Sequence, residues 1–235
     1  MRFRIATGLV VLLSFSVLFI LTIYGFIYPD SILGVLKNWL FILILMVTGC
    51  LAAFVWEYEK KNLGSKEIAL VAILSGASAV ARVPFAAIPS VQPCTYLIIC
   101  TGYVFGPLSG FMTGATTALV SNIFLGQGPW TPFQMFAWGI IGASSSLLGH
   151  FKVGELGLIV WGGLCGFLFG WIMNLWFWAA FIYPLTPSTF IFTCAQSFWF
   201  DTAHAVGNII FLSAFGKRTI IILQRYKMRF RVIFK

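Results

Sequence analysis

Residues 101–142 read TGYVFGPLSGFMTGATTALVSNIFLGQGPWTPFQMFAWGIIG and contain no Asp, Glu, Lys or Arg. The uncharged run extends from Val83 to Phe151, far beyond the roughly 20 residues that cross a bilayer as one helix. Because no charge interrupts this run, Gly and Pro must mark its turns. Gly106-Pro107 and the segment GQGPWTP at 126–132 therefore predict turns between three helices, about 94–105, 109–125 and 133–148.

The composition extends this interpretation to the whole chain of 235 residues. Hydrophobic residues make up 60%, charged residues make up 9%, and the mean hydropathy is +0.97. So few charges cannot cover the surface of a water-soluble globule of this size. This excludes a soluble enzyme, a disordered chain and a typical nucleic-acid-binding protein, and it places the chain in a membrane.

Towards the C-terminus, a polar connection from His150 to Glu155 precedes two long apolar segments, about 156–183 and 189–215, with YPLTPS between them. The first of these segments carries Gly162, Gly166, Gly170 and Asn174 at intervals of four residues. Helices in lipid associate through such stripes of small residues, so we expect this face to contact a neighbouring helix.

Towards the N-terminus, VPFAAIPSVQP at 83–93 holds three prolines and predicts a non-helical loop. Apolar segments precede it at about 68–82, 39–56 and 5–27. A cleaved signal peptide is the alternative interpretation of the segment 5–27, but no small-x-small cleavage site follows it. The hydrophilic stretch EYEKKNLGSKE at 57–67 is the clearest boundary in the chain.

The resulting fold class is all-α, a polytopic membrane helix bundle with eight crossings. Of the 15 basic residues, all except Lys37 and Arg82 fall on the side that holds both termini. By the positive-inside rule, both termini are therefore expected in the cytoplasm of a prokaryotic cell, whose plasma membrane the chain crosses several times. Anionic lipid headgroups account for the net charge of +9, so no nucleic-acid partner is expected.

The helices divide into three parts. The bulky, Leu- and Phe-rich residues 1–65 predict a two-helix appendage with a cytoplasmic linker, residues 66–216 a six-helix core, and residues 217–235 a basic cytoplasmic tail. The five cysteines lie in apolar stretches without a CxxC pair, so we expect free, buried thiols.

Two ionisable residues stand inside apolar segments, where a charge is costly and is a candidate for function. Asp201 lies well inside the last segment, where His204 and Asn208 follow on the same helix face at i+3 and i+7. Arg82 ends the 68–82 segment. One interpretation is a structural ion pair of Asp201 with Arg82 or His204. The other is a polar ligand cavity lined by this face.

The outward loops carry more side chains than turns require. Gln127, Trp130 and Gln134 lie in or beside the 126–132 loop, and Gln92 lies in the proline-rich loop. Amide groups and aromatic walls suit a neutral or zwitterionic ligand with many hydrogen-bonding groups. A tryptophan that only anchors the chain at the lipid headgroups is the alternative for Trp130.

Several kinds of chemistry have no matching motif. The chain has no HExxH or GxSxG motif of a hydrolase. It also lacks a P-loop, so it cannot power ATP-driven import alone. Asp201 and His204 lack a third ligand for a metal site, because His150 belongs to the opposite side. Two alternatives stay open: a proton-coupled carrier, and a membrane enzyme, either of them using Asp201 and His204.

The segments ARVPFAAIPSVQP (81–93), SNIFLGQGPWTPFQM (121–135) and FDTAHAVGN (200–208), together with a basic C-terminal stretch, resemble the S component of an energy-coupling-factor (ECF) transporter. This resemblance covers about 66–231 and is greatest to the cobalamin-type branch. It implies a substrate-capturing membrane subunit, not an enzyme, with a vitamin as ligand and no cofactor.

The resemblance also implies where ligand and partners bind. The ligand would lie among the two loops and the outer halves of the last two helices, a set that comprises Arg82, Gln92, Gln127, Trp130, Gln134, Asn174, Asp201, His204 and Asn208. The partners would be a membrane coupling subunit and two ATPases. The coupling subunit would dock on small residues of the 68–82 helix, for which the chain offers Ala72 with Gly76 and Ala77 with Ala81.

Overall fold

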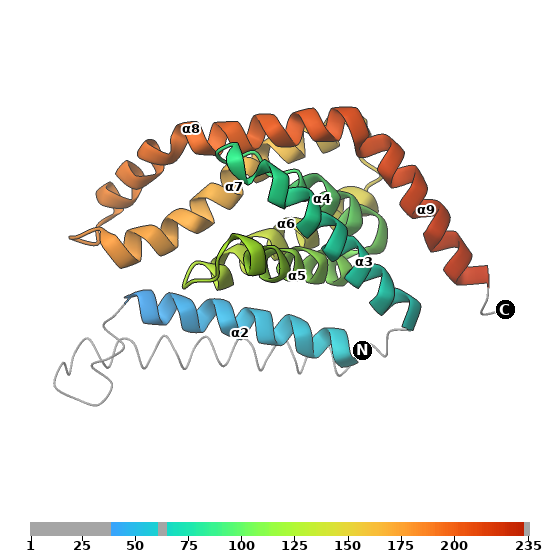
Figure 1. The fold of residues 1–235 in the computed structure, drawn as a ribbon, viewed down its shortest axis with the longest axis horizontal. Coiled ribbons are helices and arrows are strands. Elements are labelled where there is room, and N and C mark those ends of the chain that lie inside the picture. The colour runs from blue at the N-terminus through green and yellow to red at the C-terminus, as the bar shows by residue number, and fades with distance from the viewer. Residues whose placement is uncertain (1–38, 61–64, 233–235) are drawn as a thin grey trace.

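The computed structural model describes residues 39–60 and 65–232, and within them the chain is helical with short connections (Figure 1). The predicted crossing at 5–27 and Lys37 lie outside the described residues. The elements are α2 (Trp39–Lys60), α3 (Ser65–Arg82), η2 (Val83–Ala87), α4 (Cys94–Phe105), α5 (Pro107–Leu125), α6 (Thr131–His150), α7 (Glu155–Phe181), α8 (Pro187–Phe211), η3 (Leu212–Gly216) and α9 (Lys217–Val232).

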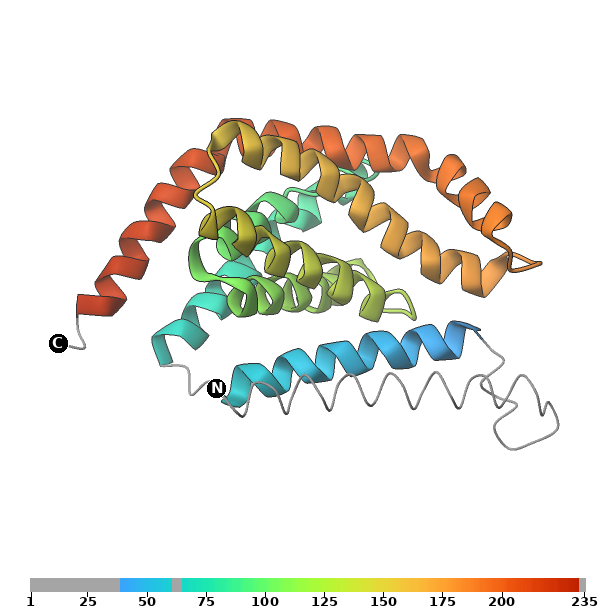
Figure 2. The ribbon, with the colours of Figure 1, turned by 180° about the vertical axis from the view of Figure 1, so that it is seen from behind.

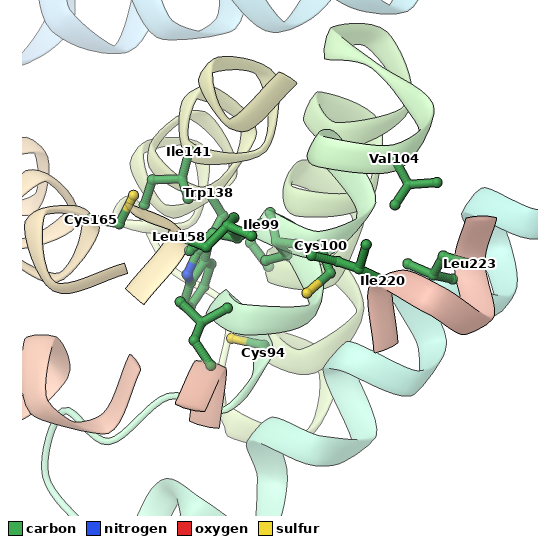
Figure 3. Packing of buried hydrophobic residues seen from close by; sticks show 13 residues of the cluster. Cys94, Ile99, Cys100, Val104, Trp138, Ile141, Leu158, Cys165, Ile220 and Leu223 are labelled. Atoms are coloured by element: carbon green, nitrogen blue, oxygen red, sulfur yellow. The ribbon is translucent and has the colours of Figure 1, made fainter. Parts of the chain in front are cut away.

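The centre of the bundle is α4, the short helix that the turn signals predicted. Ile98, Ile99 and Cys100 are fully buried, although α4 spans only 12 residues. Around them pack Trp138 of α6, Cys165 of α7 and further residues of α9 (Figure 3). Helices on several sides therefore cover α4. Cys94, Cys100 and Cys165 are free, buried thiols as expected, whereas Cys194 is free but only half-buried.

Glycines set the spacing of the helix pairs. A Cβ atom at Gly142 of α6 would overlap the carbonyl of Gly110 of α5, and one at Gly114 would overlap the carbonyl of Trp138. The stripe on α7 behaves in the same way, because Gly166 lies against the backbone of Ala205 on α8. The contact predicted for the small-residue stripe of α7 is thus confirmed, and α5 and α6 approach each other in the same way.

Two segments differ from their predictions. The loop 83–93 begins with a 3-10 turn, η2, because Pro84 stands at its start, where the missing N–H costs no hydrogen bond. The last helix does not end at Phe215. It continues through the π-helical turn η3 into α9, whose Ile220 and Leu223 are buried in the core cluster.

Four segments of the described chain are long and apolar enough to cross a membrane: 65–87, 107–125, 155–181 and 187–228. The eight predicted crossings and the orientation of the termini stay predictions. Helix α2 packs against α5, α6 and α7, along the side of the bundle that faces away from α8 (Figures 1 and 2).

Candidate functional site

The polar side chains of the bundle gather at one end. Arg82 closes α3, α4 begins with Thr95 in its first turn, α5 ends shortly after Asn122, and α6 begins near Gln134. Asn174 in the second half of α7 and Asp201 near the middle of α8 lie next to this end. Side chains far apart in the sequence thus meet at the ends of helices, where binding sites between helices commonly form.

Arg82 is the centre of the first group, which we name the Arg82 cluster. The side chain is only 6% exposed. Its Nε donates to Oε1 of Gln92 at 3.0 Å, and its Nη1 donates to Oγ of Ser121 at 2.6 Å and to Oδ1 of Asn122 at 2.7 Å. The charge is therefore held by hydroxyl and amide oxygens.

The cluster continues through Asn122 to α6. The Nδ2 atom of Asn122 donates to Oγ1 of Thr131 at 3.0 Å and to Oε1 of Gln134 at 2.7 Å. Thr131 donates in turn to Oε1 of Gln127, whose Nε2 donates to the carbonyl of Leu119. Gln127 is exposed, and its two hydrogen bonds tie the 126–130 loop to α5 and α6.

A buried chain of contacts links Arg82 to α8. The guanidinium carbon lies 4.8 Å from the ring centroid of Trp138, a cation–π distance. The Trp138 Nε1 donates to Oγ1 of Thr95 at 3.0 Å, and the same oxygen lies 2.9 Å from Nε2 of His204. Phe169 of α7 packs against both the Trp138 and His204 rings. His204 is therefore part of a packed polar and aromatic layer.

Asp201 belongs to a second group, the Asp201 cluster, made of Asn174, Ser197 and Asp201. The Nδ2 atom of Asn174 donates to Oγ of Ser197 at 2.7 Å, and Ser197 donates to Oδ2 of Asp201 at 2.9 Å. Asp201 is 5% exposed, and Gly170 leaves the space that its carboxylate fills. No ion pair joins Asp201 to Arg82 or to His204 in the described residues, so the structural ion pair expected as an alternative does not form here.

The two remaining predicted residues lie at the borders of this region. Asn208 is fully buried, and its Nδ2 donates to the carbonyl of Gly162 at 2.9 Å, while its Oδ1 has no partner within the described chain. Asn208 therefore joins α8 to α7. Trp130 packs edge-on against Trp176 of α7 at 5.8 Å, and so bridges the 126–130 loop and α7.

The sequence analysis missed Ser121, Asn122, Thr95, Trp138 and Ser197. Hydroxyl residues are common in membrane helices, where they usually bond the preceding turn, as Thr117 does with Thr113. Ser121-Asn122 did carry a signal, because the pair stands about one helical turn before the 126–132 loop. Nothing in the spacing of Thr95 or Ser197 pointed to the partners that they find.

The small residues on α3 form a separate feature at the surface. Ala72 and Ala77 are exposed, Ala81 is half-buried, and a Cβ at Gly76 would meet no atom within 4 Å. Ile73 and Val80 on the same helix are 68% and 69% exposed. This face of α3 packs against nothing in the described chain.

Comparison with known families gives one match. The family model "ECF transporter, substrate-specific component" matches residues 66–223, from the start of α3 into α9. The chain belongs to this family. No curated protein and no solved structure matches the chain.

Membership establishes a multi-pass membrane protein that acts as the substrate-binding subunit of an ECF transporter. S components of this family are not enzymes, and they associate with a membrane coupling subunit and ATPases. The match begins after α2, and the division into an N-terminal appendage, a core and a tail stays a prediction. Both polar clusters lie inside the matched region.

Proposed function

We propose that this S component captures a vitamin or vitamin precursor, with a cobalamin-type compound as the first candidate, from the outside of the cell. The observation that carries the proposal is the gathering of the Arg82 and Asp201 clusters, which hold the buried ionisable residues Arg82 and Asp201, at one end of the bundle. Ionisable groups buried inside a membrane are costly, which makes them candidates for binding or transport. The aromatic rings of Trp130, Trp138 and Phe169 supply apolar walls beside these polar groups.

The side on which this end opens follows from the positive-inside prediction. Basic side chains gather at the opposite end, where Lys152 lies in the connection before α7 and Lys217 begins α9. The polar clusters then face outwards, where a captured substrate must enter. We propose that uptake is energised in trans by two ATPases, and that the coupling subunit docks on the open face of α3 at Ala72, Gly76, Ala77 and Ala81.

A thermal-shift screen of the purified full chain tests substrate capture. The panel contains cobalamin, cobinamide, riboflavin, thiamine, biotin, folate, pantothenate and queuine. A ligand at a hundred times its dissociation constant stabilises the folded state by about 2.7 kcal/mol, which such a screen detects readily. A single strong hit supports capture and names the substrate. A folded protein that no member stabilises contradicts the proposal for this panel.

The role of Asp201 is tested by comparing two measurements on Asp201→Ala. If the Asp201 cluster binds ligand, this variant loses affinity while the ligand-free protein keeps most of its stability. Thr202→Ala is the matched control, because Thr202 bonds only the carbonyl of Phe198 in its own helix. An unchanged affinity in Asp201→Ala removes this cluster from the binding site.

The proton-coupled carrier is separated from capture by reconstitution. Proteoliposomes that hold the chain alone should bind the substrate without accumulating it, whether or not a pH gradient is present. Accumulation driven by the gradient alone would favour the carrier, in which Asp201 or His204 moves protons.

A further inference from the structure

The Arg82 cluster holds a buried cation without a carboxylate. Within the described residues the only ion pair joins Glu155 and Lys217 at 3.6 Å, at the opposite end of the bundle. Arg82 is nevertheless only 6% exposed. Neutral oxygens satisfy part of its hydrogen-bonding capacity, but they do not cancel its charge, and an uncompensated buried charge is strongly unfavourable.

The chemistry of arginine also fixes the direction of every hydrogen bond around it. A guanidinium only donates, so Gln92 and Asn122 must turn their amide oxygens towards Arg82. The Nδ2 group of Asn122 then points away, and it donates to the oxygen of Gln134. These amide orientations follow from the donor, and the usual ambiguity between oxygen and nitrogen does not arise.

The atoms left over in the cluster are therefore donors. No hydrogen bond within the described chain uses Nη2 of Arg82, Nε2 of Gln92 or Nε2 of Gln134. None of the three is among the fully enclosed donors without a partner, so each keeps some free surface in the described structure. Nearby, Nε1 of Trp176 is a buried donor without a partner, on the ring that packs against Trp130. The cluster thus offers N–H groups to an incoming molecule.

The Asp201 cluster has the opposite polarity. Asn174 donates to Ser197, and Ser197 donates to Oδ2 of Asp201, so Oδ1 of Asn174 and Oδ1 of Asp201 remain as acceptors. A carboxylate or phosphate would be repelled there. An anionic group has one favourable place in the site, beside Arg82.

We propose that the substrate carries an anionic group, a carboxylate or a phosphate, which binds at the Arg82 cluster through Arg82, Gln92 and Gln134. This inference rests on the proposed capture of a small molecule, and it narrows the substrate class. Cobalamin meets the requirement through its phosphodiester, which cobinamide lacks. Folate, biotin and pantothenate meet it through carboxylates, whereas riboflavin and thiamine do not meet it.

The test compares pairs of compounds that differ in the anionic group. The pairs are biotin and biotinamide, pantothenate and panthenol, and riboflavin 5′-phosphate and riboflavin. Affinities are measured by isothermal titration on the full chain. Because a hydrogen bond to a charged group contributes about 1.5–3 kcal/mol, the anionic member should bind about 10- to 150-fold more tightly. The pairs also separate carboxylate from phosphate recognition.

The variant Arg82→Gln shows whether Arg82 is responsible. It should lower the affinity for the anionic member by the same factor and leave the affinity for the neutral member unchanged. The two members of a pair should then bind with similar affinity. Arg218→Gln on the exposed surface of α9 is the matched control and should preserve the preference. The comparison of pairs on the unaltered chain stands even if Arg82→Gln does not fold.

Two results would overturn the inference. A neutral member that binds as tightly as its anionic counterpart would show that the site recognises no anion, while capture itself would stand. A preference for the anion that persists in a folded Arg82→Gln variant would place the anion elsewhere. Failure of every compound to bind the folded chain contradicts the proposed function, and the inference falls with it.

Discussion

Glycine serves two purposes in this bundle, and the contrast between α6 and α3 makes the difference visible. At Gly142 of α6, the backbone of α5 occupies the place of a side chain. At Gly76 of α3, the same space is empty to a distance of 4 Å. The first glycine allows two helices of one chain to approach each other. The second leaves open space, which the proposed docking of the coupling subunit on α3 would use.

The sharpest test of this contrast is Gly142→Val. The added carbons meet the carbonyl of Gly110, which cannot rotate away as a side chain would, so α5 and α6 must separate. We expect a loss of about 3 kcal/mol or more in the free energy of unfolding. Thermal unfolding in detergent, followed by labelling of the buried thiols of Cys94 and Cys100, measures it.

Gly76→Val provides the control for that experiment, because the same substitution finds open space on α3. Equal losses of stability in the two variants would break the contrast and would place Gly76 in an internal contact.

An intermediate effect is expected at Gly170 of α7. A Cβ there would overlap the carboxylate of Asp201, the end of a side chain that can move. Gly170→Ala should therefore cost about 1 to 2 kcal/mol of stability and, by displacing Asp201, lower substrate affinity about tenfold.

The matched control is Gly163→Ala, about two helical turns away. The atom nearest to the added Cβ there is Cδ1 of Ile209 at 3.2 Å. This variant should keep the substrate affinity. If Gly170→Ala also keeps it, the Asp201 cluster lies outside the binding site.

The smallest effect on stability is expected for Gly76→Leu. The free energy of unfolding should change by no more than about 0.5 kcal/mol, and substrate affinity should not change. ATP-dependent uptake by the chain together with its coupling subunit and ATPases should fall about tenfold, because the larger side chain prevents close docking.

Ile73→Leu on the same face keeps the volume of the side chain and serves as the control for uptake. Normal uptake by Gly76→Leu would move the docking surface away from this part of α3.

The helices of the charge-free region were predictable because Gly and Pro interrupt it at regular places. The range 94–105 agrees with α4, and α5 begins at Pro107 after the predicted turn. The predicted loop 126–132 is shorter, at 126–130, because α6 begins at Thr131. The end of the last helix was not predictable, since Gly216 before a basic stretch is a common stop signal. Burial of Ile220 and Leu223 on the core keeps the chain helical beyond it.

The candidate site, too, was predictable from the sequence only in part. Arg82 and Gln92 stood out singly, because a charge and an amide are rare among apolar residues and prolines. That Arg82 meets Asn122, and not Asp201, depends on how α3 and α5 pack, which no spacing in the sequence encodes. The sequence shows which polar side chains are energetically unfavourable inside a membrane, but the packing of the helices determines which partners they contact.

The uninterrupted helical segment 187–228 has a geometric consequence for the whole protein. Its 42 residues correspond to about 63 Å of helix, roughly twice the 30 Å of the hydrocarbon layer. The chain bends at η3, and α9 leaves the axis of α8 (Figures 1 and 2). In the proposed topology, Arg218 and Arg225 of α9 then lie at the cytoplasmic headgroups, each contributing about 1 kcal/mol on an anionic surface. The tilt of α8, which carries Asp201 and His204, thereby becomes sensitive to the lipid composition of the inner leaflet.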